Sequence, residues 1–141
     1  MRFSIAAAAP LLSAANALIS GIAVPETVAP GDTIQATITT QNYIQAVYDV
    51  AIVFGFAPGD GFPGSLGSVL GSFYLGPHES NIVTNITKTI TIPDGIAKGD
   101  GIITASVMSL WGAAAGPALN TFNVTITVGD VTSKTYKSSH Q

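Results

Sequence analysis

The chain of 141 residues contains no cysteine, so disulfides are excluded. Small secreted domains usually gain stability from disulfides, and a chain without them must hold its fold by packing alone. Two explanations of this absence stay open. Either a single domain of this size has core enough, or the protein must stay folded both in an oxidising exterior and in a reducing cytosol.

Residues that carry chemistry are also scarce. Histidine occurs only at His78 and His140, and no Ser-His-Asp set can be assembled around either. A metal site needs three or four converging ligands, which the turn at His78 and Glu79 does not offer. The glycine-rich stretch 58–71 lacks the Gly-Lys-Ser/Thr end of a phosphate-binding loop, and Asp60 lacks the alternating acids of a calcium loop. We therefore predict no enzyme, no cofactor and no metal, while a glycosidase acid pair is invisible to such patterns.

Charged residues make up 9% of the chain, and its net charge is −3. Lys and Arg form no cluster along the sequence. Because neutralisation of phosphates requires clustered basic side chains, nucleic acid is not expected as a partner.

The first feature that is present is an export signal. Arg2 supplies a positive start, residues 3–12 an apolar run, and Ala15-Asn16-Ala17 a small-x-small site for signal peptidase. We predict a signal peptide over residues 1–17, cleavage after Ala17, and a secreted protein. A membrane anchor is disfavoured, because Pro10 and polar residues interrupt the apolar run and no basic flank follows it. No membrane span is expected.

The mature chain alternates apolar and polar residues, which is the period-two pattern of half-buried strands. The pattern predicts seven strands with turn residues between them, over residues 19–24, 33–40, 48–56, 72–75, 82–92, 102–110 and 122–128. In the third strand, Val50 and Phe54 are expected on the core face and Asp49 on the opposite face. Helical periodicity is nowhere sustained.

Seven short strands at this spacing favour an all-β fold, and specifically an immunoglobulin-like antiparallel β-sandwich without a disulfide. The Cys pair and the strand-three tryptophan of antibody domains are missing, since the only tryptophan is Trp111. We predict one sandwich domain over residues 18–130. Residues 131–141, rich in Ser, Thr and Lys, are expected to form a flexible polar tail.

Two sequons, Asn85-Ile86-Thr87 and Asn123-Val124-Thr125, lie on predicted strands with both asparagines on the polar face. Each can accept an N-linked glycan in the secretory pathway. Because a Thr-rich sheet face also produces such triplets by chance, the prediction is that at least one of Asn85 and Asn123 is glycosylated.

The loop over residues 41–47 has the composition of an interface, because Tyr43 and Ile44 stand among amides instead of the usual Gly, Asp and Ser. Aromatic loop residues are favoured anchors in protein interfaces. We predict Tyr43, Ile44 and Trp111 as partner contacts. The alternative, that these side chains cap the end of the core, is equally compatible with the sequence.

Five segments follow one another along nearly the whole mature chain: ISGIAVPETVAPGDT at 19–33, QNYIQAVYDVAIVFGFAP at 41–58, GSVLGSFYLGP at 67–77, SNIVTNIT at 80–87 and NTFNVTITVGD at 120–130. In these segments the chain resembles the necrosis-inducing secreted protein family of fungi. Members of that family are secreted effectors that suppress pattern-triggered immunity in plants by binding receptor-like kinases and receptor-like cytoplasmic kinases, and some provoke cell death.

The resemblance therefore implies a kinase-inhibiting effector that is secreted and then translocated into the host plant cytoplasm. It would also give the cysteine-free composition a reason, because the cytosol is reducing. It supplies no catalytic motif and no kinase-contact residue. The alternative is a secreted cell-wall or carbohydrate-binding module, since such sandwiches often display aromatic side chains in loops or on one face.

Overall fold

The computed structural model of the full chain describes residues 16–139, so the predicted signal peptide lies outside the described residues apart from Asn16 and Ala17. This part of the chain contains nine strands and a short 3-10 turn, η2 (Gly76–His78). The strands are β1 (Ala17–Pro25), β2 (Thr27–Val28), β3 (Thr33–Asn42), β4 (Val47–Pro58), β5 (Ser68–Tyr74), β6 (Ile86–Thr91), β7 (Gly99–Trp111), β8 (Gly116–Val128) and β9 (Tyr136–Ser138). Within residues 16–139 no helix has the length and apolar character that crossing a membrane requires.

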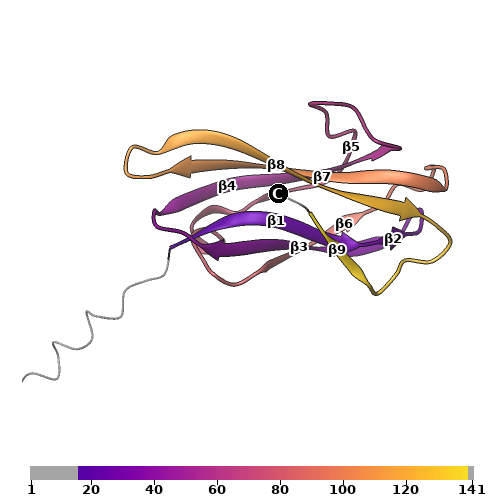
Figure 1. Cartoon of the computed structure of the whole chain (residues 1–141), viewed down its shortest axis with the longest axis horizontal. Helices are drawn as coiled ribbons and strands as arrows, with labels where there is room; N and C mark the ends of the chain where they lie inside the picture. Colours follow the sequence, from indigo (N-terminus) through magenta and orange to yellow (C-terminus); the bar gives the residue numbers. More distant parts are fainter. Residues whose placement is uncertain (1–15, 140–141) are drawn as a thin grey trace, which may run out of the picture.

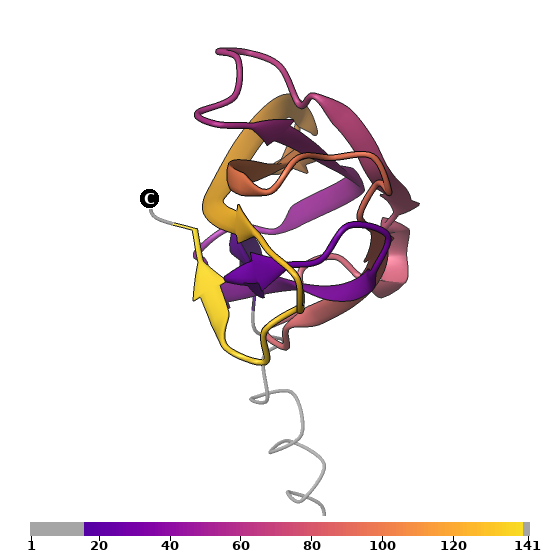
Figure 2. The ribbon, with the colours of Figure 1, turned by 90° about the vertical axis from the view of Figure 1, so that its right-hand side faces the viewer.

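The strands form two sheets that lie face to face (Figures 1 and 2). One sheet has the order β6-β3-β1-β9 and the other the order β2-β8-β7-β4-β5. All neighbouring strands are antiparallel except β2 and β8, which run parallel. The prediction of an all-β fold is confirmed. Each of the seven predicted strands corresponds to one of the long strands, and β2 and β9 are additional.

The core lies between the two sheets and consists mainly of β-branched and aromatic side chains. Ile22 and Ile38 of the first sheet and Phe54 and Ile103 of the second are fully buried. The Phe54 ring meets that of Phe73 edge to face, with centroids 6.2 Å apart. Because burial of one such side chain contributes roughly 1.5–3 kcal/mol, a core of this kind accounts for a stable domain without disulfides.

One irregularity in β4 changes which side chains face the core. The pairing of β4 with β7 shifts register between Asp49 and Ala51. An extra residue reverses the inside-outside alternation, so Val47 and Asp49 face inward before the bulge and Ile52 and Phe54 after it. The prediction that Asp49 lies on the outer face is therefore wrong, since this residue is 2% exposed.

The C-terminal segment differs from the predicted flexible tail over residues 131–141. Up to Ser139, the last described residue, this segment is held against the sandwich, and its strand β9 pairs with β1. The Tyr136 hydroxyl donates to the Gln35 carbonyl at 2.8 Å, and the Ser139 N–H donates to the Ile22 carbonyl at 2.8 Å. Polar composition is typical of frayed ends, but here it belongs to an edge strand whose side chains face solvent.

The glycine-rich segment forms a loop, residues 59–67, between β4 and β5. Figure 2 shows this loop projecting at the top, beyond the five-stranded sheet. Its last residues return to β4 so closely that a Cβ atom on Gly55 would collide with the Leu66 carbonyl, and one on Gly67 with the Phe56 carbonyl. Gly67 also has a φ of +76°, which favours glycine. These close approaches hold the last residues of the loop against β4.

Candidate functional site

Three segments distant in sequence meet at one end of the sandwich. They are the β3–β4 connection, the segment after β5 and the β7–β8 turn, and we call residues 43–48, 76–81 and 110–115 the aromatic end. The Gly112 N–H donates to the Ala46 carbonyl at 3.1 Å, which ties the turn to the connection. Val47 pairs with Trp111 at the adjoining ends of β4 and β7.

All three predicted partner contacts lie at this end. The rings of Tyr43 and Trp111 meet edge to face, with centroids 5.3 Å apart and planes at 87°. Both side chains are half-buried, whereas Ile44, the residue after Tyr43 in the loop, is 89% exposed. The Nε1–H of Trp111 is buried and has no hydrogen-bond partner in the described residues. Tyr43 and Trp111 thus form a packed aromatic pair, which we call the base, and the exposed Ile44 directly follows Tyr43 in the chain.

An apolar pocket of about 590 Å³ opens beside this base. Its walls come from all three segments: Ala46, Val47, Tyr48, Pro77, Ser80, Asn81, Leu110, Gly112 and Ala115. Sequence patterns gave no reason to group Pro77 or Leu110 with the loop at 41–47, because only the fold brings them together. This volume lies within the usual range of ligand-binding clefts.

The wall at Ser80 is held to β4 by a buried polar network. The Ser80 hydroxyl accepts from the Asp49 N–H at 2.8 Å and donates to the Gly76 carbonyl at 2.6 Å. The Asp49 carboxylate accepts from the Ser109 hydroxyl at 2.6 Å. Burial raises the pKa of Asp49, and the hydrogen bond from Ser109 lowers it in part.

An exposed tyrosine of the aromatic end, Tyr48, is paired with Tyr74 of β5 on the outer face of the larger sheet. The hydroxyls of Tyr48 and Tyr74 are 3.1 Å apart and share a hydrogen bond. This bond raises the pKa of Tyr48. Tyr74 is 66% exposed, so the pair offers apolar ring surface next to a polar edge.

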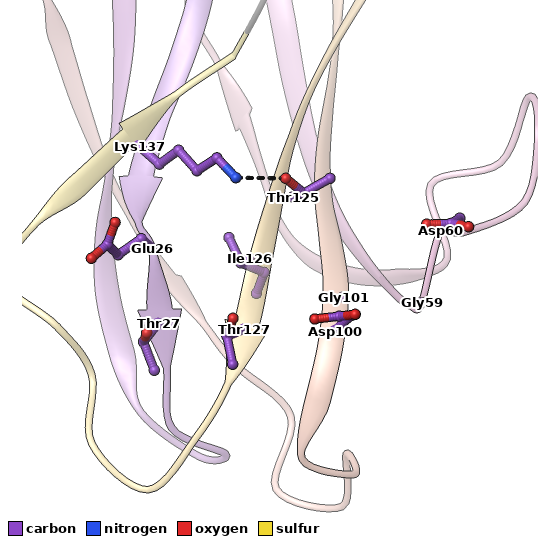
Figure 3. Close-up of a pocket in the computed structure, with 10 residues that line it drawn as sticks. All are labelled: Glu26, Thr27, Gly59, Asp60, Asp100, Gly101, Thr125, Ile126, Thr127 and Lys137. Atoms are coloured by element: carbon purple, nitrogen blue, oxygen red, sulfur yellow. Dashed lines mark hydrogen bonds between the residues drawn. The ribbon is translucent and has the colours of Figure 1, made fainter.

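A second pocket, of about 490 Å³, lies over the end of β8, with β2 and β9 on one side and the start of β7 on the other (Figure 3). Glu26, Asp60 and Asp100 contribute carboxylates, and Lys137 donates to the Thr125 hydroxyl at 2.7 Å. Within residues 16–139 no three side chains of His, Asp or Glu converge as metal ligands. Lys137 lies at this pocket because its segment forms strand β9, which is paired with β1.

The two sequons occupy different surroundings. Asn85 is exposed in the connection before β6, where its Oδ1 accepts from the Thr40 N–H at 3.3 Å. Asn123 is exposed on β8 and lines a groove of about 440 Å³ beneath the loop 59–67, with Phe62 and Leu119 among its apolar residues. Neither asparagine is buried, so the fold leaves room for a glycan on each.

Comparison with known proteins agrees with this all-β domain. The model of the Nis1 family matches residues 15–127. The chain belongs to the Nis1 family. The match includes every segment of the aromatic end, so the site described above lies inside the shared domain of the Nis1 family.

Two relatives are similar over nearly their full length. The necrosis-inducing secreted protein 1 of Colletotrichum higginsianum is 57% identical over 141 residues, which cover 99% of this chain and 98% of the relative. The protein of the same name from Colletotrichum orbiculare is 53% identical over 137 residues, covering 96% and 85%. The predicted family resemblance and the prediction of secretion are confirmed, and this Nis1-family chain is a secreted protein.

Solved structures offer only distant likenesses. A superoxide reductase (neelaredoxin) from Ignicoccus hospitalis is 16% identical, with a TM-score of 0.47 over 81% of this chain and 80% of that one. Its E23A variant is 18% identical, with a TM-score of 0.48 over 89% and 86%. No functional conclusion about the Nis1-family chain follows from likenesses of this size.

Proposed function

We propose that this protein is a secreted effector that induces necrosis in plant tissue and suppresses pattern-triggered immunity by binding receptor-like kinases and receptor-like cytoplasmic kinases. The two relatives are named for the induction of necrosis, and this supports the first half of the proposal. Family resemblance supports the second half. The mode of action is binding and inhibition, without catalysis by the effector itself.

The observation that carries the proposal is the exposure of Ile44 directly after Tyr43, whose ring packs against Trp111. Ile44 is 89% exposed, while the ring of the preceding residue Tyr43 packs edge to face against that of Trp111. Burial of a large apolar side chain stabilises a protein, and in this exposed position only a partner can bury it. Because the base is already ordered, binding loses little side-chain entropy.

The neighbouring pocket adds a place for an apolar side chain of the kinase. Its walls carry Leu110, Val47 and Pro77 together with the polar residues Tyr48, Ser80 and Asn81. Interfaces commonly combine an apolar centre with polar groups at the rim. We assign Ile44 and this pocket to the centre of the kinase interface.

Work inside the host cell is part of the same proposal. The chain has no cysteine, so its fold is the same in the oxidising secretory pathway and in a reducing cytosol.

The proposal also assigns the sandwich to the immunoglobulin-like type. It is supported by the neighbour orders β1-β3-β6 and β4-β7-β8, which are the orders of strands A, B, E and C, F, G in that fold.

The test is a pull-down of the purified mature chain against recombinant plant receptor-like kinase domains and receptor-like cytoplasmic kinases. Phosphorylation is assayed in the same samples. We expect retention of at least one kinase together with reduced phosphorylation. If no kinase is retained, the proposal fails.

One observation favours a second candidate function, a cell-wall or carbohydrate-binding module. The exposed rings of Tyr48 and Tyr74 lie side by side on an open sheet face, and aromatic rings commonly pack against sugars. Retention of the mature chain on chitin, glucan or cellulose, and loss of that retention in Tyr74→Ala, would support this function over kinase binding.

A further inference from the structure

Residues 16 and 17 are an integral part of the sandwich. Ala17 is the first residue of β1, lies opposite Asn42 in β3, and is fully buried. The carbonyl of Asn16 accepts from the Tyr43 N–H at 2.9 Å. A chain that began at Leu18 would lose this buried methyl group and the hydrogen bond that anchors the Tyr43 loop.

The side-chain amide of Asn81 clamps the same two residues. Its Oδ1 accepts from the Ala17 N–H at 3.0 Å, and its Nδ2 donates to the Asn16 Oδ1 at 3.0 Å. Asn81 has a φ of +56°, a left-handed conformation that costs free energy in residues other than glycine. Both hydrogen bonds offset this cost, and cleavage after Ala17 would leave Asn81 with neither.

The sequence contains a second small-x-small triplet two residues upstream. Ser13-Ala14-Ala15 has a small residue at both ends, as signal peptidase requires. We propose that signal peptidase hydrolyses the Ala15–Asn16 bond, so that the mature chain begins at Asn16. Water supplies the oxygen of the new Ala15 carboxylate, and Asn16 keeps the nitrogen as its α-ammonium group. The proposal does not rest on the kinase-binding function.

Processing at this bond keeps the clamp in the mature protein. With Asn16 present, the Tyr43 N–H and the Asn81 amide retain the partners seen in the structure. Asn81 lines the apolar pocket and Tyr43 packs against Trp111, so the clamp holds two parts of the aromatic end. The cleavage predicted after Ala17 differs by only two residues, which a mass measurement resolves.

The first test is the intact mass of the protein secreted by yeast from its full-length precursor, after enzymatic removal of glycans, together with N-terminal sequencing. We expect Asn16 as the first residue. Leu18, or any other first residue, overturns the proposal.

The second test measures whether the clamp exists in the folded protein. Chains that begin at Asn16 and at Leu18 are released from a fusion partner, each with Asn81 and with Asn81→Gly, because glycine tolerates the positive φ. We expect the Leu18 chain to melt about 5 °C or more below the Asn16 chain. Asn81→Gly should lower the Tm of the Asn16 chain and leave that of the Leu18 chain nearly unchanged. Equal Tm values for the two starting points would contradict the clamp.

Discussion

At the scale of single residues, the buried carboxyl group of Asp49 has a consequence for stability. Its native-state pKa is raised by burial, so the native state binds this proton more tightly than the unfolded chain does. The favourable contribution is therefore complete below the unfolded pKa of about 3.9 and is lost as the pH rises through the native pKa. At neutral pH the ionised group carries a desolvation cost, which the hydrogen bond from Ser109 reduces.

We predict that Asp49→Asn removes this pH dependence. Asparagine can still accept from the Ser109 hydroxyl through its Oδ1, and it has no charge to desolvate. The Tm of the variant minus that of the wild type should be highest near about pH 7 and should fall as the pH is lowered to about 4. Thermal unfolding followed by circular dichroism across this range checks the prediction. Asp60→Asn, in the exposed loop, serves as the charge-matched control. A Tm difference for Asp49→Asn that stays constant with pH would contradict it.

Asp49 also marks where residue-level prediction from sequence ends. Alternation along residues 48–56 correctly predicts Phe54 as buried. The prediction fails at Asp49 because the bulge depends on the pairing of β4 with β7, and no residue nearby in the sequence indicates a bulge. Of the candidate site, Tyr43, Ile44 and Trp111 could be chosen from their types. That Tyr43 contacts Trp111 follows only from the fold.

At the scale of elements, β9 shows how an edge strand can resemble a tail. Several hydrogen bonds fix the segment, including Ala29 N–H to the Thr132 hydroxyl at 3.0 Å and Glu26 N–H to the Thr135 carbonyl at 3.0 Å. Their partners lie about a hundred residues away in sequence. A composition rich in Ser, Thr and Lys cannot reveal contacts at this separation, whereas the strong alternation of β3, β7 and β8 can be recognised locally.

We predict that truncation after Asp130 destabilises the domain. Each backbone hydrogen bond of the β1–β9 ladder contributes roughly 0.5–1.5 kcal/mol, so the free energy of unfolding should fall by about 2–4 kcal/mol. Urea denaturation of the truncated and full-length mature chains measures this difference. Removal of residues 140 and 141 alone provides the control. An unchanged urea midpoint after truncation at Asp130 would show that the segment is a tail after all.

The two sequons permit a separate prediction about glycosylation. Asn85, in an exposed connection, is expected to carry a glycan when the protein is secreted from yeast, because exposed connections are accessible acceptors. Mass spectrometry before and after deglycosylation should show an increment that Asn85→Gln abolishes. Asn123→Gln is the matched comparison and reports occupancy beneath the loop 59–67. A mass increment unaffected by Asn85→Gln would contradict the prediction.

At the scale of the whole molecule, two packed sheets supply the rigidity that disulfides provide in other small secreted domains. The fold class follows from strand periodicity, and the family follows from segments distributed along the mature chain. The aromatic end does not follow from either. Its three segments come from different connections, and their meeting depends on strand order and on the lengths of β4 and β7.

The measurement that tests the central claim most directly is the affinity of the mature chain for the kinase domain that it retains, compared between the wild type and two variants. Ile44→Asp places a charge on the aromatic end, and Val69→Asp places one on β5 at a residue that is 65% exposed. Both side chains are largely exposed, so neither variant should alter the fold. We predict at least a tenfold loss of affinity, about 1.4 kcal/mol, for Ile44→Asp and no change for Val69→Asp. Wild-type affinity in Ile44→Asp, or an equal loss in Val69→Asp, would contradict the assignment of the aromatic end as the kinase-binding surface.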